Sequence, residues 1–200
     1  RNLVKARRTR GLPRQFPLDE GTAWLLGLYV AEGSVCYGAG PSVTVSLGKH
    51  EGRLISRTRQ IFDRLGFKNS ADQKRTAVNI RVFSAPLARF LEANCGRGAA
   101  NKRIPDFIIF HSNTWLLQCF LTGYFEGDGY DSLSKGTIET ATVSKTLALQ
   151  LQLALARLGH LGKIYVKHGG PATIQQRPVM TREAYLLNFI PRPKRHLRHI

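Results

Sequence analysis

Two acidic residues occupy matching places in two similar stretches of the sequence. Each stretch runs from an apolar start through a glycine to an acid that is followed by another glycine: WLLGLYVAEGS (residues 24–34) and FLTGYFEGDGY (residues 120–130). Glu32 and Asp128 therefore fall at the C-terminal ends of two expected helices, where the helix dipole disfavours negative charge. If the helices pack together, the two carboxylates converge and each raises the pKa of the other. A divalent cation relieves both costs, and oxygen ligands with room for water and phosphate oxygens suit Mg²⁺.

Small residues four positions apart would allow such close packing. On a helix, each of these pairs forms a strip without side-chain bulk: Gly27 with Ala31, and Gly123 with Gly127. We expect Gly33 and Gly129 to end the two helices in the left-handed conformation that glycine tolerates. A structural helix pair explains the strips, but it does not explain two costly acids.

The similarity continues downstream and predicts a duplicated unit. SLGK (46–49) leads into an amphipathic stretch ending in RLG (64–66), and VSK (143–145) leads into another ending in RLG (157–159). We predict a basic N-terminal segment at 1–18 and two half-domains at 19–110 and 111–200. Within each, the periodicities indicate a helix, two strands, a helix, two strands and a short helix. The expected fold is α+β, with two αββαββα units related by a pseudo-twofold axis and with antiparallel sheets.

The charge balance indicates an anionic partner. Thirty Lys and Arg residues stand against thirteen Asp and Glu residues, which gives a net charge of +17. An excess of this size destabilises a fold unless a partner neutralises it, and nucleic acid offers many phosphates at once. The alternative is a generally basic protein without a nucleic acid partner.

Cysteine usage and hydropathy suggest an intracellular protein. Cys36, Cys95 and Cys119 are widely spaced and form no disulfide or zinc pattern, so we expect three buried thiols. The chain shows no signal peptide and no apolar run of membrane-spanning length. We expect a cytoplasmic location in a prokaryote, or an organelle or nucleus otherwise.

Strand alternation separates an expected core face from an expected DNA face. The types that face outward fit a sheet that reads base edges in the major groove. In the first unit this set is Ser42, Thr44, Ser46, Asn79 and Arg81, and in the second unit it is Thr140, Thr142, Lys163, Tyr165 and Lys167. Hairpin tips add Tyr37, Gln73, Lys74 and Arg75, and then Gln175, Arg177 and Arg182. For any single residue the alternative is a solvated polar side chain.

LLGLYVAEG (25–33) and LTGYFEGDG (121–129) resemble the two motifs of monomeric LAGLIDADG homing endonucleases. The resemblance implies two units that meet at the motif helices, with saddle-shaped antiparallel sheets in the DNA major groove. It implies cleavage of both strands of a long, nearly asymmetric double-stranded site by a monomer, leaving 3′ overhangs. The implied cofactor is Mg²⁺, for which Mn²⁺ or Ca²⁺ substitutes in binding.

The same resemblance assigns roles to particular residues. The metal-binding acids fall on Glu32 and Asp128, and the carbonyls of Ala31 and Gly127 precede them as further ligands. KRIP (102–105) resembles the segment that carries a catalytic lysine in intein-borne members, which points to Lys102. Plain phosphate contact is the alternative for this lysine.

Three features qualify these assignments. Lys194 is a weaker catalytic candidate, in the corresponding region of the second unit. The first motif has Glu where the family name has Asp, so weaker cleavage of one strand is expected from the displaced carboxylate. Glu126 precedes Asp128 by two residues and points in another helical direction, so we treat it as peripheral.

Two other functions fit the same fold. One is an RNA maturase that binds its host intron RNA and assists splicing, and the other is a catalytically silent DNA-binding protein. The retention of both acids argues against the silent protein and leaves the maturase open. A glycosidase that uses the carboxylate pair fits neither the charge nor the glycine strips. The sequence leaves an intron, intein or free-standing origin open.

Overall fold

The computed structural model describes residues 16–191 except 39, 133–135 and 175–176. The first unit contains α1 (Glu20–Glu32), β1 (Gly33–Cys36), β2 (Ser42–Gly48), α2 (Gly52–Arg64), β3 (Asn69–Gln73), β4 (Ala77–Phe83) and α3 (Ala85–Cys95). A connecting segment contains the 3-10 turn η1 (Ala99–Asn101) and the short helix α4 (Asp106–Ile109). The second unit contains α5 (Thr114–Asp128), β5 (Tyr130–Ser132), β6 (Thr137–Thr142), α6 (Lys145–Arg157), β7 (Gly162–Lys167), β8 (Gly170–Ile174), β9 (Arg177–Thr181) and β10 (Ala184–Phe189).

The predicted α+β fold with two repeated units is confirmed. Each unit has a four-stranded antiparallel sheet, in the order β1-β2-β4-β3 in the first unit and β5-β6-β10-β7 in the second. The second unit departs from the predicted order because a separate hairpin, β8–β9, is inserted between β7 and β10. Its final short helix was expected within residues that lie outside the described part of the chain.

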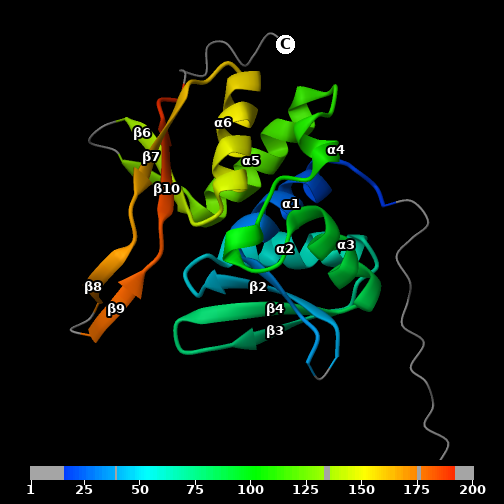
Figure 1. The fold of residues 1–200 in the computed structure, drawn as a ribbon. Coiled ribbons are helices and arrows are strands. Elements are labelled where there is room, and N and C mark those ends of the chain that lie inside the picture. Colours follow the sequence, from blue (N-terminus) through cyan, green and yellow to red (C-terminus); the bar gives the residue numbers. More distant parts are fainter. Residues whose placement is uncertain (1–15, 39, 133–135, 175–176, 192–200) are drawn as a thin grey trace, which may run out of the picture.

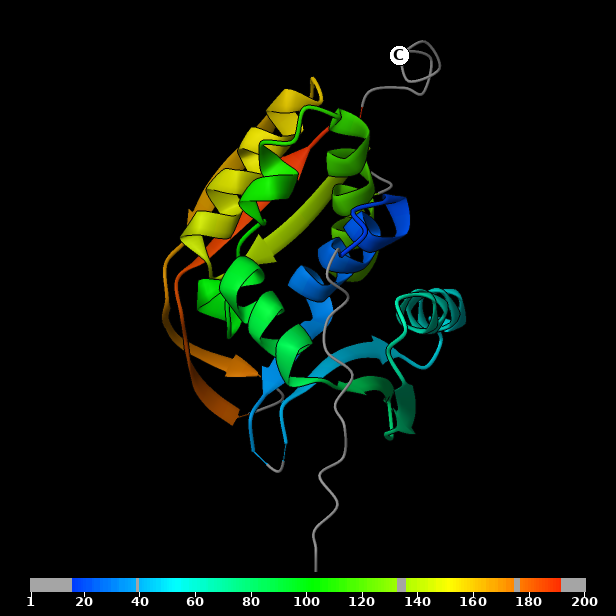
Figure 2. The same ribbon diagram turned by 90° about the vertical axis from the view of Figure 1, so that its right-hand side faces the viewer.

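The two motif helices lie side by side at the centre of the molecule, which both ribbon views show (Figures 1 and 2). Asp19 caps α1 by accepting a 2.8 Å hydrogen bond from the amide of Thr22, as the sequence predicted. Asn113 caps α5 in the same way through the amide of Trp115, at 2.9 Å. The residues of α1 from Thr22 to Val30 are all buried. A helix that is apolar on every side is a core helix, and here its main neighbour is α5.

Glycines bring the backbones of α1 and α5 into direct contact. A Cβ atom at Gly27 would lie 1.9 Å from the carbonyl oxygen of Phe120, and one at Gly123 would lie 2.0 Å from that of Trp24. These distances are far below contact distance, so no larger residue fits either position without separating the helices. The predicted strips are confirmed as the packing surface.

The predicted left-handed ends of these helices are wrong. Gly33 and Gly129 have φ values of −93° and −83°, in the extended region. The chain passes directly from each helix into a strand, so no reversal of the backbone is needed. Glycine is required at Gly33 because a Cβ atom there would lie 2.1 Å from the Tyr29 ring.

Each sheet packs one face against helices. In the first sheet Val43, Val45, Ile80 and Val82 face α1, α2 and α3 and are at most 1% exposed. In the second sheet Leu187 is the most deeply buried residue on the face that packs against α6. Within the described part of the chain, no helix covers the opposite faces (Figure 1). The architecture therefore leaves two open sheet faces.

The three cysteines are free thiols, but they are not all buried as predicted. Cys95 is buried, Cys119 is partly exposed, and Cys36 is exposed. Cys36 follows the buried Val35 on edge strand β1, so alternation places it on the open face. Among the described residues, no helix is long and apolar enough to cross a membrane.

Gly123→Ala is expected to lower the free energy of unfolding by about 3 kcal/mol, because the new methyl group would force the two backbones apart. Urea denaturation measures the change. Gly52→Ala is the control, because a Cβ atom at this first residue of α2 meets nothing within 4 Å. Equal stability of the two variants would show that the α1–α5 contact is not as close as described.

Candidate metal centre and nucleic-acid interface

The helix packing places Glu32 and Asp128 at one end of the α1–α5 pair. Glu32 is the last residue of α1 and Asp128 is the last residue of α5. A Cβ atom at Gly127 would lie 3.1 Å from Cγ of Glu32, so the first acid lies against the residue that precedes the second. The structure therefore brings the two predicted acids together from positions far apart in the sequence.

Both carboxyl groups hold their protons more tightly than usual. Burial, followed by the negative charges of Asp128 and Glu51, raises the pKa of Glu32 from 4.5 to about 7, and Lys102 opposes the rise. Partial loss of hydration also raises the pKa of Asp128, whose side chain keeps some contact with solvent, and Lys102 opposes that rise. The ionised carboxylates are therefore electrostatically unfavourable at this site, and a bound cation would stabilise them.

The oxygen donors at this end fit a hard divalent cation. Ala31 and Gly127 lie in the last turns of α1 and α5, where carbonyl oxygens have no amide four residues further along the helix. Two carboxylates and such carbonyls are ligands that suit Mg²⁺, with water completing the shell. Within the described residues, no three His, Cys, Asp or Glu side chains group as a metal cage. Two carboxylates and two carbonyls would leave positions on an octahedral Mg²⁺ ion for water or other oxygen ligands.

Lys102 lies at the same end of α1 and is 7% exposed. Its ammonium donates hydrogen bonds of 2.7 Å to the carbonyl oxygens of Tyr29 and Gly33, and it lies 4.0 Å from the centre of the Tyr29 ring. Burial lowers its pKa to about 8, while Asp128 and Glu32 favour the charged form. The structure thus brings Lys102 beside the acid pair, where its charge offsets theirs and the negative end of the helix dipole.

One acid near the site was missed by the sequence interpretation. Glu51 precedes α2, accepts a 2.5 Å hydrogen bond from the amide of Gly48, and raises the pKa of Glu32 through its charge. Ser144 precedes the matching helix α6 in the second unit. Because this acid has no counterpart in the repeat, the repeat pattern gave no signal for it.

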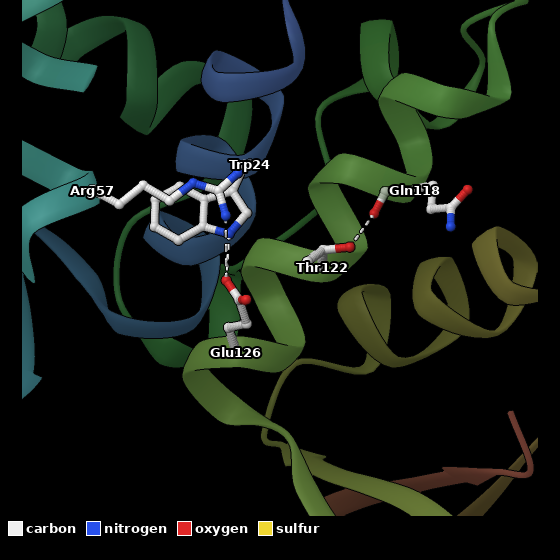
Figure 3. Close-up of polar contacts among 5 residues, drawn as sticks. All are labelled: Trp24, Arg57, Gln118, Thr122 and Glu126. Carbon is white, nitrogen blue, oxygen red and sulfur yellow. Dashed lines mark hydrogen bonds and ion pairs between the residues drawn. The ribbon is translucent and has the colours of Figure 1, made fainter. Parts of the chain in front are cut away.

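Glu126 is directed elsewhere, as predicted. Its carboxylate accepts a 2.5 Å hydrogen bond from the indole N–H of Trp24 and lies 3.8 Å from the guanidinium of Arg57. Arg57 stacks on the Trp24 ring at 4.0 Å (Figure 3). Further along α5, Thr122 donates to the carbonyl oxygen of Gln118 at 2.9 Å. Glu126 therefore connects α5 to α1 and α2, and its role is structural.

The open face of the first sheet carries the predicted set. Thr44 lies opposite Arg81 and Ser46 opposite Asn79, all on the face away from the buried valines and all partly exposed. Ser42 lies on the same face but is only 5% exposed. Among the described residues, the buried Nε of Arg81 has no hydrogen-bond acceptor within the protein. That face is polar, with one cation near its centre.

In the second sheet, one of the two predicted rows faces outward and the other faces inward. Lys163, Tyr165 and Lys167 are exposed on the open face. Thr140 is only 6% exposed, shares a hydrogen bond of 3.1 Å with the Tyr124 hydroxyl, and lies opposite the buried Leu187. Thr142 lies on the same inner face.

The outward orientation predicted for Thr140 and Thr142 is therefore wrong. The hydroxyl of Thr142 accepts a 3.1 Å hydrogen bond from the amide of Ser144. Partners of this kind allow threonine hydroxyls to face a core. Thr137, Glu139 and Ala141 take the outward positions.

The predicted hairpin-tip residues differ in their surroundings. Gln73, Lys74 and Arg75 are exposed around the β3–β4 turn, and Arg182 is exposed between β9 and β10. Tyr37 is not a free tip residue, because its hydroxyl donates to Glu92 and Arg97 lies 5.1 Å from its ring. Arg177 begins β9. Gln175 and Lys194 lie outside the described residues.

Comparison with known families identifies the class of protein. The family model described as the LAGLIDADG-like domain matches residues 19–93 and 115–192, one match for each unit. The chain therefore belongs to the LAGLIDADG-like domain family.

Curated relatives are much longer than this chain. It is 45% identical over 127 residues to the replication factor C small subunit of Methanocaldococcus jannaschii, which is 56% of this chain and 7% of that protein. It is 33% identical over 159 residues to the ATP-dependent DNA helicase Hel308 of Thermococcus kodakarensis, which is 76% of this chain and 14% of that protein. The chain thus spans less than a fifth of either relative.

Solved structures share the fold at low sequence identity. A complex of I-DmoI with DNA and Ca has a TM-score of 0.61 at 16% identity, over 86% of this chain and 83% of that chain. The N-terminal LAGLIDADG domain of DUF199/WhiA has a TM-score of 0.55 at 14% identity, over 93% and 88%. These similarities show a two-unit LAGLIDADG fold, which occurs in proteins of more than one kind.

Glu32→Gln is expected to raise the thermal stability of the metal-free protein at pH 8. The folded-state pKa of about 7 exceeds the ordinary 4.5, so the folded state loses stability as the pH rises between these values. Glutamine removes that loss, so the gain over the parent should be complete above pH 7 and absent near pH 4. Thermal denaturation in chelator across this range checks it, and a variant that is less stable than the parent at pH 8 would contradict it.

Proposed function

We propose that this protein is a site-specific endonuclease that hydrolyses one phosphodiester in each strand of double-stranded DNA. The observation that carries the proposal is the convergence of Glu32 and Asp128 at the joined ends of α1 and α5, with raised pKa values. A structural helix pair would not retain two acids at this cost. The net charge of +17 gives the reason for a polyanionic substrate.

Each part of the candidate site has a task in this reaction. A bound divalent ion, Mg²⁺ in our proposal, would supply activation of water and stabilisation of the leaving oxygen. Glu32 and Asp128 would hold it through their carboxylates, with the carbonyls of Ala31 and Gly127. The ammonium of Lys102 would neutralise charge that develops near the acids.

The open sheet faces would position the DNA. The face of the first sheet is mainly small and polar around Arg81, whereas that of the second carries Lys163, Tyr165 and Lys167. Two different surfaces within one chain would read two different half-sites, which supports a nearly asymmetric target and a monomer. Structures of I-DmoI, called a homing endonuclease, contain DNA with Ca or Mn, which supports the same class of substrate and cofactor here.

The relatives support an inserted module. The chain matches regions of a replication factor subunit, a helicase and a DNA polymerase, and the matched regions form 7%, 14% and 10% of those proteins. The different functions of these proteins do not explain why they share a similar region. We therefore favour an origin within host proteins, as in inteins, over an intron origin.

Asp128→Asn is expected to abolish cleavage. The parent protein with Mg²⁺ and a library of long duplexes should cut a subset of sequences, and the variant should cut them at least roughly a thousandfold more slowly because one ligand carboxylate is lost. Glu126→Gln is the matched control, because this acid lies two residues away and serves Trp24 and Arg57. Binding without cutting by the parent would refute the nuclease and favour a silent DNA-binding protein. Equal cutting by Asp128→Asn would refute the site.

Arg81→Ala is expected to weaken DNA binding by roughly 1–3 kcal/mol, because the guanidinium lies on the open face of the first sheet. Affinity measured over a range of salt concentrations and over target variants separates phosphate contact from base contact. Arg59→Ala is the control, because Arg59 lies on α2, where its Nε donates to Asn69 at 3.0 Å. An unchanged salt slope together with unchanged sequence preference would contradict the assigned DNA face.

A further inference from the structure

Lys102 connects the two units through different atoms. Its ammonium bonds to α1 in the first unit, as described above. Its main-chain carbonyl accepts a 2.7 Å hydrogen bond from the hydroxyl of Ser144, at the start of α6 in the second unit. Ser144 is fully buried and also caps α6 by accepting from the amide of Leu147 at 3.2 Å. The lysine whose ammonium lies near the first acid is therefore bonded through its main chain to the second unit.

Gln150 holds the same segment two residues further along. The amide N–H of Ile104 donates to Oε1 of Gln150 at 2.7 Å, and Nε2 of Gln150 donates to the carbonyl oxygen of Ile104 at 3.2 Å. One side chain thus binds both main-chain polar groups of a residue that is fully buried. A pair of hydrogen bonds of this kind fixes both the position and the orientation of the backbone at Ile104.

The matching position in the first unit does something else. Gln150 is the sixth residue after the N-cap Ser144, and Arg57 is the sixth residue after the N-cap Glu51. Arg57 stacks on Trp24 and pairs with Glu126, which lie on the two motif helices (Figure 3). The two hydrogen bonds between Gln150 and Ile104 are therefore specific to α6 and do not follow from the repeat.

We infer that Gln150, supported by Ser144, is a positioning residue for Lys102. It sets the register of the connecting segment so that the ammonium meets the carbonyls of Tyr29 and Gly33 beside Glu32. A buried ammonium that is bonded to two fixed acceptors tolerates little displacement, and a misplacement of about 1 Å can slow catalysis by up to about a hundredfold. The effect on cleavage rests on the proposed function, whereas the effect on Lys102 itself does not.

The kinetic test compares two glutamines on one helix. Gln150→Leu removes both bonds to Ile104, while Gln152→Leu removes one bond to the carbonyl oxygen of Gly162, at 2.9 Å. With saturating DNA, Gln150→Leu should cleave about tenfold more slowly than the parent with unchanged DNA affinity, and Gln152→Leu should match the parent. Gln150→Leu combined with Lys102→Met should be no slower than Lys102→Met alone, because both changes act through the same ammonium. Multiplying losses, or equal effects of the two glutamine variants, would overturn the inference.

A second readout does not depend on cleavage. Reductive methylation followed by mass spectrometry reports the reactivity of Lys102, which is low in the parent because the side chain is buried. Gln150→Leu should raise this reactivity severalfold, and Gln152→Leu should not. Should Gln150→Leu fail to fold, Gln150→Glu replaces it, because it keeps the acceptor for Ile104 N–H and loses only the donor. If the parent cuts no duplex, the proposed function fails, and the methylation result still decides the role of Gln150.

Discussion

The contact between α1 and α5 passes through backbone atoms, and the position of every functional group depends on it. Gly27 lies against the carbonyl of Phe120 and Gly123 against that of Trp24, with no space for a side chain between them. Because the helices touch along their length, their ends meet as well. The packing of α1 against α5 therefore both joins the two units and brings Glu32 close to Asp128.

Closeness creates an electrostatic problem that shapes the surroundings of the acids. Burial and the negative charges of Asp128 and Glu51 raise the pKa of Glu32 to about 7. The positive charge of Lys102 lowers the pKa of both acids, and the connecting segment that carries this lysine is hydrogen-bonded to Ser144 at the start of α6. Stability and chemistry therefore compete at one place, which is common at active sites.

The repeat made the central features predictable and left the asymmetric ones out of reach. Glu32, Asp128 and the strips of small residues could be found because the motif that contains them occurs twice with the same internal spacing. Thr140 and Thr142 were assigned to the wrong face because threonine suits either face, and the Tyr124 hydroxyl that holds Thr140 is identified only by the fold. The partners of Lys102 were equally hidden, since Tyr29 and Gly33 lie 73 and 69 residues away along the chain.

The same asymmetry makes the two units of the duplicated fold different in their contacts. Position six of the second helix is Arg57 in one unit, where it binds a motif helix, and Gln150 in the other, where it binds the connecting segment. The inserted hairpin β8–β9 also belongs to one unit only. In the proposed function, such differences would let each half contact its own DNA sequence while both share the joined helix ends.

The most direct test of a metal centre shared by the two units is the anomalous scattering of Mn²⁺ in crystals of the protein bound to a duplex selected from the library. The account predicts a manganese peak between the carboxylates of Glu32 and Asp128. Manganese bound only elsewhere, with these two carboxylates unliganded, would contradict it.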